Sequence, residues 1–168
     1  MALLEWSDAL VLGESRMDDT HREFVDCLNA LGDADDASLV AALDRFIEHS
    51  DTHFADENAR MEATAFPPAH CHVTEHANVL NLCREVRQMV IDGKIEVGRV
   101  LARELAPWFT QHAGSMDTML AYWLNLDDAG RSEALRISQE KQAEMRAAMV
   151  ARGEEAETAM SCGPGCAH

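Results

Sequence analysis

Apolar residues recur along most of the chain at alternating intervals of three and four positions, a pattern typical of α-helices that pack through one face. Four such stretches are separated by short breaks, at residues 18–31, 38–63, 67–91 and 95–124. Residues 1–16 are expected to form an irregular lead-in. Because short links favour antiparallel neighbours, the pattern predicts an all-α fold, an antiparallel up-down-up-down four-helix bundle.

The helical pattern weakens after residue 126. Residues 131–151 could form a fifth helix, but their apolar stripe is thin, and near the end Gly-Pro-Gly separates Cys162 from Cys166. We therefore expect a bundle domain of residues 1–126 and a C-terminal extension of residues 127–168 that ends in a mobile cysteine-containing tail. A metal-binding or redox-active tail is the alternative interpretation of the two cysteines.

Composition and charge narrow the classes of partner. The chain has 168 residues, 47% of them apolar, and its net charge is −16. Such an acidic surface repels phosphate backbones and anionic lipid, so neither nucleic acid nor a membrane is expected as a partner. The N-terminus lacks the basic and apolar regions of a signal peptide, and the five cysteines show no disulfide-framework spacing. A cytoplasmic location is the resulting expectation.

Polar residues interrupt all four predicted inward faces. They are His21 in the first helix, His53 and Glu57 in the second, His72 and His76 in the third, and His112 and Asp117 in the fourth. A spacing of four places two side chains on one helical face, so one helix can offer two ligands to one site. Burying so many titratable groups is costly unless they pair or bind metal.

The donor set favours a pair of divalent metal ions. Imidazole and carboxylate together suit iron, manganese or zinc. Two Fe²⁺ ions, two carboxylates and one bridging hydroxide sum to a net charge of about +1, which a buried site tolerates. Shared between two octahedral irons, the five imidazoles, the two carboxylates and the bridge leave one position empty. A small ligand could bind at that position.

The order of these segments resembles the signature of the hemerythrin family, over roughly residues 3–124. The segments are His21, then His53-Phe-Ala-Asp-Glu57, then His72-Val-Thr-Glu-His76, then His112-Ala-Gly-Ser-Met-Asp117. The resemblance implies that His72, His76 and His112 hold one iron, that His21 and His53 hold the other, and that Glu57 and Asp117 bridge both. It also implies reversible dioxygen binding at a non-haem di-iron centre, at the iron with two histidines, for oxygen storage, delivery or sensing.

Two other functions are compatible with the same centre, namely a di-iron oxidase or peroxidase and an iron-handling or redox-sensing module. An oxidase needs a proton donor near the open iron, and the chain has a single tyrosine, Tyr122. This scarcity favours an oxygen-binding protein over an enzyme. The dioxygen pocket is expected to be lined by Phe24, Leu28, Trp108 and Met119, although ordinary core packing would also explain these residues. No protein partner is indicated.

Three further polar residues lie close to the predicted ligands along the chain but are not counted among them. Glu75 lies inside His-Val-Thr-Glu-His but is one position away from the general base of a zinc-protease motif, so we expect it on the surface. His49 is expected to be exposed or to support the ligands from outside. Asn58 follows Glu57 where members of the family often carry a second acid, and this difference is expected to matter little.

The ligand pair of the fourth helix has an unusual spacing. His112 and Asp117 are five residues apart, which leaves them roughly 140° apart around an ideal helix. Either the two side chains approach a wide dimetal centre from its two flanks, or the helix widens into a π-type turn. Gly114 makes backbone change easier, and Pro107 loosens the hydrogen bonds upstream. We predict a bend or a widened turn between Pro107 and Asp117.

Overall fold

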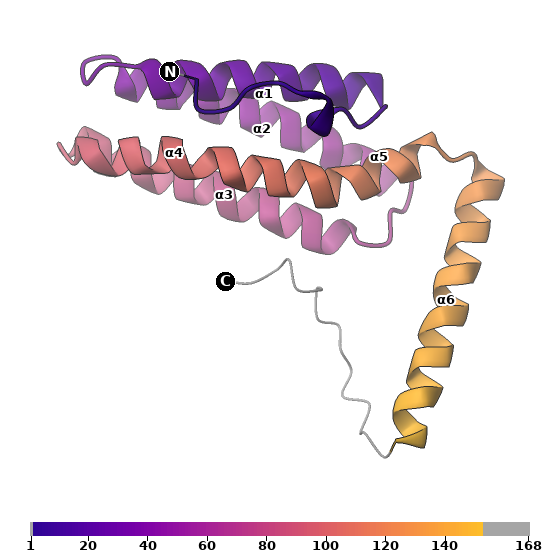
Figure 1. The fold of residues 1–168 in the computed structure, drawn as a ribbon. Helices are drawn as coiled ribbons and strands as arrows, with labels where there is room; N and C mark the ends of the chain where they lie inside the picture. Colours follow the sequence, from indigo (N-terminus) through magenta and orange to yellow (C-terminus); the bar gives the residue numbers. More distant parts are fainter. Residues whose placement is uncertain (1, 153–168) are drawn as a thin grey trace. The chain divides into compact units, whose positions relative to one another are not determined.

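The computed structural model describes residues 2–152, and helices dominate this part of the chain (Figure 1). A short 3₁₀ turn, Asp8–Leu10, precedes them. The elements that follow are α1 (Ser15–Asp33), α2 (Leu39–Ala63), α3 (Ala69–Ile91), α4 (Ile95–His112), a π-helical segment (Ala113–Asp117), α5 (Thr118–Asn125) and α6 (Asp128–Ala151). The described residues contain no strand, which confirms the predicted all-α class.

The first four helices form the bundle. Helix α1 packs against α2, α2 against α3, α3 against α4, and α4 against α1, so the ring of contacts closes. Figure 1 shows α1 and α2 in one layer and α3 and α4 in the other. The helices run in alternating directions, which confirms the predicted up-down-up-down topology. The π-helical segment and α5 continue the line of α4.

The predicted apolar stripes form the core between these helices. Fully or almost fully buried members are Phe24, Leu28, Leu31, Leu39, Leu43, Phe46, Val79, Cys83, Val86, Val90, Leu101 and Leu105. Each large apolar side chain of this kind contributes about 1.5–3 kcal/mol through the hydrophobic effect. Close helix contact requires glycine at one point, because a Cβ on Gly98 would lie 2.7 Å from Val90 Cγ2 and 3.0 Å from Leu39 Cδ2.

Helix α1 begins three residues before the predicted start at Asp18. The Glu14 side chain caps the helix by accepting a hydrogen bond from the Met17 N–H at 2.9 Å. Asp18 lies in the first turn, and its carboxylate accepts hydrogen bonds from Leu12 N at 2.7 Å and Gly13 N at 3.1 Å. Asp18 therefore ties the irregular lead-in to the bundle and does not cap the helix.

The predicted widening of the fourth helix is confirmed. Residues 113–117 are π-helical, and the Thr118 N–H bonds to the Ala113 carbonyl, five residues back. The Thr118 hydroxyl also donates to this carbonyl at 2.9 Å, and Ser115 Oγ donates to the Gln111 carbonyl at 2.6 Å. These side-chain donors satisfy carbonyl groups in the stretch where the regular α-helical ladder is interrupted.

The widened turn also corrects one prediction. Met119 was expected to face inward and to line the dioxygen pocket, but 48% of it is exposed. Leu120 is fully buried in its place. A π-turn adds one residue to a helical turn, so each later residue is rotated by about 100° relative to an unbroken α-helix. Leu120 therefore occupies the inward-facing position that was expected for Met119.

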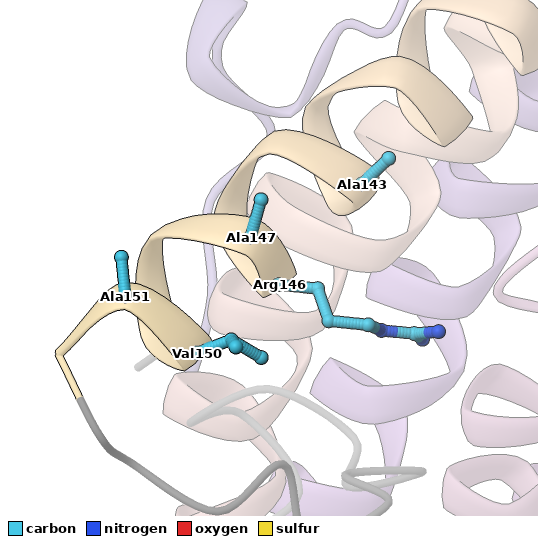
Figure 2. A pocket seen from close by; sticks show the side chains of 5 residues that line it. All are labelled: Ala143, Arg146, Ala147, Val150 and Ala151. Carbon is cyan, nitrogen blue, oxygen red and sulfur yellow. The ribbon is translucent and has the colours of Figure 1, made fainter.

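A second compact unit begins at Trp123, and its described part contains the end of α5 and helix α6. Asp127 caps α6 by accepting a hydrogen bond from Gly130 N at 2.7 Å. None of the α6 side chains is buried. Figure 2 shows Ala143, Ala147 and Ala151 along one side of α6, beside a shallow surface hollow.

The division into domains of residues 1–126 and 127–168 stays a prediction, although the first compact unit ends nearby, at Tyr122. Cys162 and Cys166 lie outside the described residues. Among the helices that the structure describes, none combines the length and the apolar character that crossing a membrane requires.

Candidate metal centre

The structure brings the seven sequence-predicted site residues together in the interior of the bundle. Each is exposed by 4% or less. Helix α1 supplies His21, α2 supplies His53 and Glu57, α3 supplies His72 and His76, α4 supplies His112, and the π-helical segment supplies Asp117. Two groups of ligand atoms each lie within 4.8 Å of one another. One group comes from Glu57, His72, His76, His112 and Asp117, and the other comes from His21, His53 and Glu57. Glu57 belongs to both groups.

The Glu57 carboxylate spans the two groups of histidines. Its Oε1 lies 3.0 Å from His53 Nε2 and 3.7 Å from His21 Nε2. Its Oε2 lies 3.3 Å from His76 Nε2 and 3.7 Å from His72 Nε2. One carboxylate oxygen therefore faces the pair of histidines, and the other faces the set of three.

Asp117 repeats this arrangement from the other side. Its Oδ2 lies 3.3 Å from His21 Nε2. Its Oδ1 lies 3.0 Å from His72 Nε2 and 3.2 Å from His112 Nε2. The two carboxylates thus join a two-histidine group, His21 and His53, to a three-histidine group, His72, His76 and His112.

The nitrogens of the three-histidine group need a cation between them. His112 Nε2 lies 3.1 Å from His72 Nε2 and 3.2 Å from His76 Nε2. Neutral imidazoles that present lone pairs to one another repel unless a proton or a metal ion lies between them. Both Asp117 oxygens and Glu57 Oε2 also lack a hydrogen bond of acceptable geometry, despite the nearby nitrogens. These buried, unsatisfied donor atoms fit a metal site.

The electrostatics of the metal-free cluster point the same way. Burial disfavours the charged form of His21, but the carboxylates of Asp117 and Glu57 outweigh it and raise the pKa of His21 to about 9. Burial, with the charges of His72 and His112, lowers the pKa of His76 to about 4. At His112, burial is outweighed by the charge of Asp117, which raises the pKa of this residue as well. When no metal is bound, protons thus gather on His21 and His112, beside the carboxylates, and avoid His76.

Both carboxylates are held ionised. Burial and the charge of Asp117 raise the pKa of Glu57, but its close contacts with His21, His53 and His76 hold it well below its usual value. Burial likewise opposes ionisation of Asp117, but the charge and close contact of His112 lower its pKa well below the usual value. Two negative charges in a dry interior require positive charge beside them, which divalent metal ions would provide.

Comparisons with known proteins agree with this geometry. Residues 12–124 match the hemerythrin HHE cation binding domain. Bacteriohemerythrin of Ralstonia nicotianae is 52% identical over 124 residues, which cover 74% of this chain and 90% of that protein.

The chain belongs to the hemerythrin family. Bacteriohemerythrin of Pseudomonas paraeruginosa is 28% identical over 142 residues, 82% of this chain and 85% of that protein. The crystal structure of a wild-type hemerythrin matches the fold with a TM-score of 0.69 at 23% identity, covering 74% of this chain and 100% of that one. The buried cluster therefore fits a metal-binding site, in a chain that belongs to a family named for cation binding.

Asn58 supports this hemerythrin site from outside the cluster. Its Oδ1 lies 3.0 Å from His76 Nδ1, so the imidazole donates through Nδ1 and presents Nε2 to the cluster. From the sequence, Asn58 was expected to matter little, and its contact with His76 corrects this. The available signal was its position directly after a buried acid, on a helix that carries two ligands.

Glu75 also has a role that the sequence analysis missed. It was expected on the surface, but it is half-buried, and its carboxylate accepts a hydrogen bond from Trp108 Nε1 at 2.8 Å. The Trp108 ring stacks on His112, with the centroids 4.9 Å apart. Trp108 therefore lies beside the three-histidine group, whereas the expected dioxygen pocket belongs to the two-histidine group.

Aromatic rings enclose the two-histidine group. Phe24 contacts His53 edge-on, with the ring centroids 6.0 Å apart, and Phe109 contacts His21 edge-on at 5.1 Å. The two phenylalanines stack on each other at 4.1 Å. Phe24 was predicted for the pocket from the sequence, whereas Phe109 was not, although its position one turn before His112 offered a signal.

Two other sequence-predicted positions lie near this wall. Leu28, also predicted for the pocket, is fully buried in the hydrophobic core. His49 is half-buried, with its ring 5.9 Å from His53 and 6.3 Å from Phe24 between centroids. His49 thus lies against a predicted ligand from outside the cluster, in line with one of the two interpretations given above.

Proposed function

We propose that this hemerythrin-family chain binds dioxygen reversibly at a non-haem di-iron centre. The observation that carries the proposal is the division of the cluster into two and three histidines, joined by two carboxylates that each face both groups. Storage, delivery and sensing of oxygen all follow from the same chemistry. The cytoplasmic location stays a prediction.

The number of donors leaves one place for a small ligand. The three-histidine group with one oxygen from each carboxylate offers five donors to one metal ion, whereas the two-histidine group offers four. A hydroxide bridge would complete six-fold coordination in the first case and leave one position open in the second. Dioxygen would therefore approach beside His21 and His53.

Iron suits this donor set better than zinc. Structural and catalytic zinc sites are commonly tetrahedral, whereas five or four protein donors with a bridge suit octahedral metal ions. Two ferrous ions, when bound, would supply the electrons that dioxygen accepts. Neutral imidazoles and two carboxylates keep the net charge of the loaded site small, which favours its burial.

The surroundings of the two-histidine group favour a carrier over an enzyme. Phe24 and Phe109 are fully buried and place hydrocarbon edges beside His53 and His21. An apolar wall excludes water and the protons that would release a reduced oxygen species. Tyr122, the single tyrosine, is 64% exposed and does not enter the cluster as a proton donor.

Iron analysis and rapid mixing test the proposal together. Aerobically purified protein should contain two irons per chain, and His21→Ala should reduce the content while the exposed His70→Ala leaves it unchanged. The diferrous protein should form a lasting oxygenated spectrum when it is mixed with dioxygen, and removal of dioxygen should reverse it. Rapid decay that consumes a reductant would instead show an oxidase or peroxidase.

A further inference from the structure

Glu75 lies on α3 between two predicted ligands, but its carboxylate is directed to a different helix. It accepts the hydrogen bond of the Trp108 indole N–H at 2.8 Å. A half-buried indole N–H needs an acceptor, and a charged acceptor gives a stronger bond than a neutral one. This bond therefore fixes the indole of α4 to α3.

The fixed indole in turn contacts a ligand. Its ring lies nearly parallel to the His112 imidazole, with an interplanar angle of 19°. Phe54 meets Trp108 edge-on, with the centroids 6.3 Å apart, and stacks on His76 at 4.0 Å. The indole is thus held by Glu75 through its N–H and by Phe54 at its ring.

The His112 ring also contacts Phe54, but the two rings are tilted and 6.4 Å apart between centroids, so the stacked indole is the closer contact from outside the cluster. The Nδ1 of His112 is buried and has no hydrogen-bond partner, whereas the Nδ1 of His76 is held by Asn58. The Nδ1 atoms of His21, His53 and His72 are buried without a partner too, but within the described residues only the His112 ring has an indole stacked on it. Ligand imidazoles are normally oriented by a hydrogen bond at the nitrogen that does not bind metal. At His112, the stacked indole takes that place.

We propose that Glu75 and Trp108 act as a positioning pair that sets the orientation of the His112 imidazole toward the metal of the three-histidine group. The inference rests on the proposed function, because it treats His112 as an iron ligand. Neither residue of the pair touches the metal. Glu75 acts through Trp108, and Trp108 acts through the plane of the His112 ring.

Iron release into excess 2,2′-bipyridine tests the pair in the iron-loaded full chain. Glu75→Ala removes the acceptor and should accelerate one phase of release by about tenfold, the lower end of the effect expected for outer partners of metal ligands. Glu75→Gln retains an acceptor oxygen and should restore a nearly normal rate. Glu85→Ala, at an exposed position on the same helix, is the control.

A double-mutant cycle separates positioning from simple packing. Trp108→Phe keeps a ring to stack but lacks the N–H donor, so adding Glu75→Ala to it should not accelerate release further. The melting temperature of the metal-free variants shows whether the fold is retained. A packing role would lower that temperature in Glu75→Ala and leave the release rate unchanged.

The outcomes distinguish the two proposals. If the unsubstituted protein holds two irons and Glu75→Ala releases them at the normal rate, the positioning pair is overturned and the di-iron centre stands. Additive effects of Glu75→Ala and Trp108→Phe on the rate of iron release would also overturn the proposed positioning pair. If the unsubstituted protein, produced in iron-replete medium, holds no iron, the proposed function fails, and the positioning pair fails with it.

Discussion

His112 Nε2 and Asp117 Oδ1 lie 3.2 Å apart although the two residues are separated by five positions on one continuous helical run. The π-helical segment between them makes this contact possible, because a wider turn returns the chain to the same face after five residues. The proposed ligand set thus depends on a local departure from α-helical geometry.

The first prediction concerns Gly114 within this segment. A Cβ added to Gly114 would meet nothing within 4 Å, and the Gly114 backbone does not occupy the left-handed region. Gly114→Ala should therefore preserve the π-turn and stabilise the protein by up to about 1 kcal/mol, as alanine does in helices. Gly98→Ala, at a close helix contact, should destabilise it. Urea unfolding of both variants provides the test, and a destabilised Gly114→Ala would show that the turn requires glycine.

The second prediction concerns Asn58. Asn58→Ala leaves His76 Nδ1 without its acceptor, so iron affinity should fall by about 10- to 100-fold. Asn58→Asp should retain the bond, and its charge should lower the reduction potential of the centre by making His76 a stronger donor. Chelator competition and redox titration measure these effects, with Asn78→Ala, exposed on α3, as the control. Equal affinities of Asn58→Ala and the control would contradict the role.

The third prediction is that the metal-free protein is most stable near pH 6.5. Below this pH, His21 is protonated in the folded and unfolded states, and its stabilisation is complete. As the pH rises toward 9, the unfolded chain loses that proton first, and the stabilisation is lost. As the pH falls toward 4, the unfolded chain protonates His76 first, which favours unfolding. The free energy of unfolding should fall by about 3 kcal/mol along each of these two limbs of the pH profile, the alkaline limb above pH 6.5 and the acid limb below it.

Denaturant titrations of metal-free protein at several pH values check this dependence. His21→Leu should reduce the alkaline limb, leaving the part due to His112, whose pKa is also raised, whereas the exposed His70→Gln should keep both limbs. Iron-loaded protein should also lose the alkaline limb, because metal takes the place of the proton on His21. An alkaline limb that is undiminished in His21→Leu would show that His21 does not contribute to it.

The fourth prediction concerns the wall beside the two-histidine group. Phe109→Leu and Phe46→Leu each replace a buried ring and should each cost about 1 kcal/mol of stability. Phe109 contacts His21, whereas Phe46 packs on Phe24. Only Phe109→Leu should therefore shorten the lifetime of the oxygenated spectrum, by admitting water. Equal lifetimes in the two variants would mean that the wall does not protect the site.

The sequence by itself determined the four helices and the seven polar residues that the structure buries together. Both depend on spacing along one helix: apolar residues every three or four positions mark the buried face, and polar residues in the same register share it. The five-residue interval between His112 and Asp117 even predicted the widened turn, because no regular α-helix aligns that pair.

The tertiary structure alone decided which neighbours surround the cluster. Leu120 is buried where Met119 was expected, because residues after the π-turn take their rotation from the way the turn closes. The bond of Glu75 to Trp108 joins α3 to α4, and the contact of Phe109 with His21 joins α4 to α1. Such contacts depend on how far each helix is rotated and shifted against the next, and spacing within one helix carries no information about that rotation.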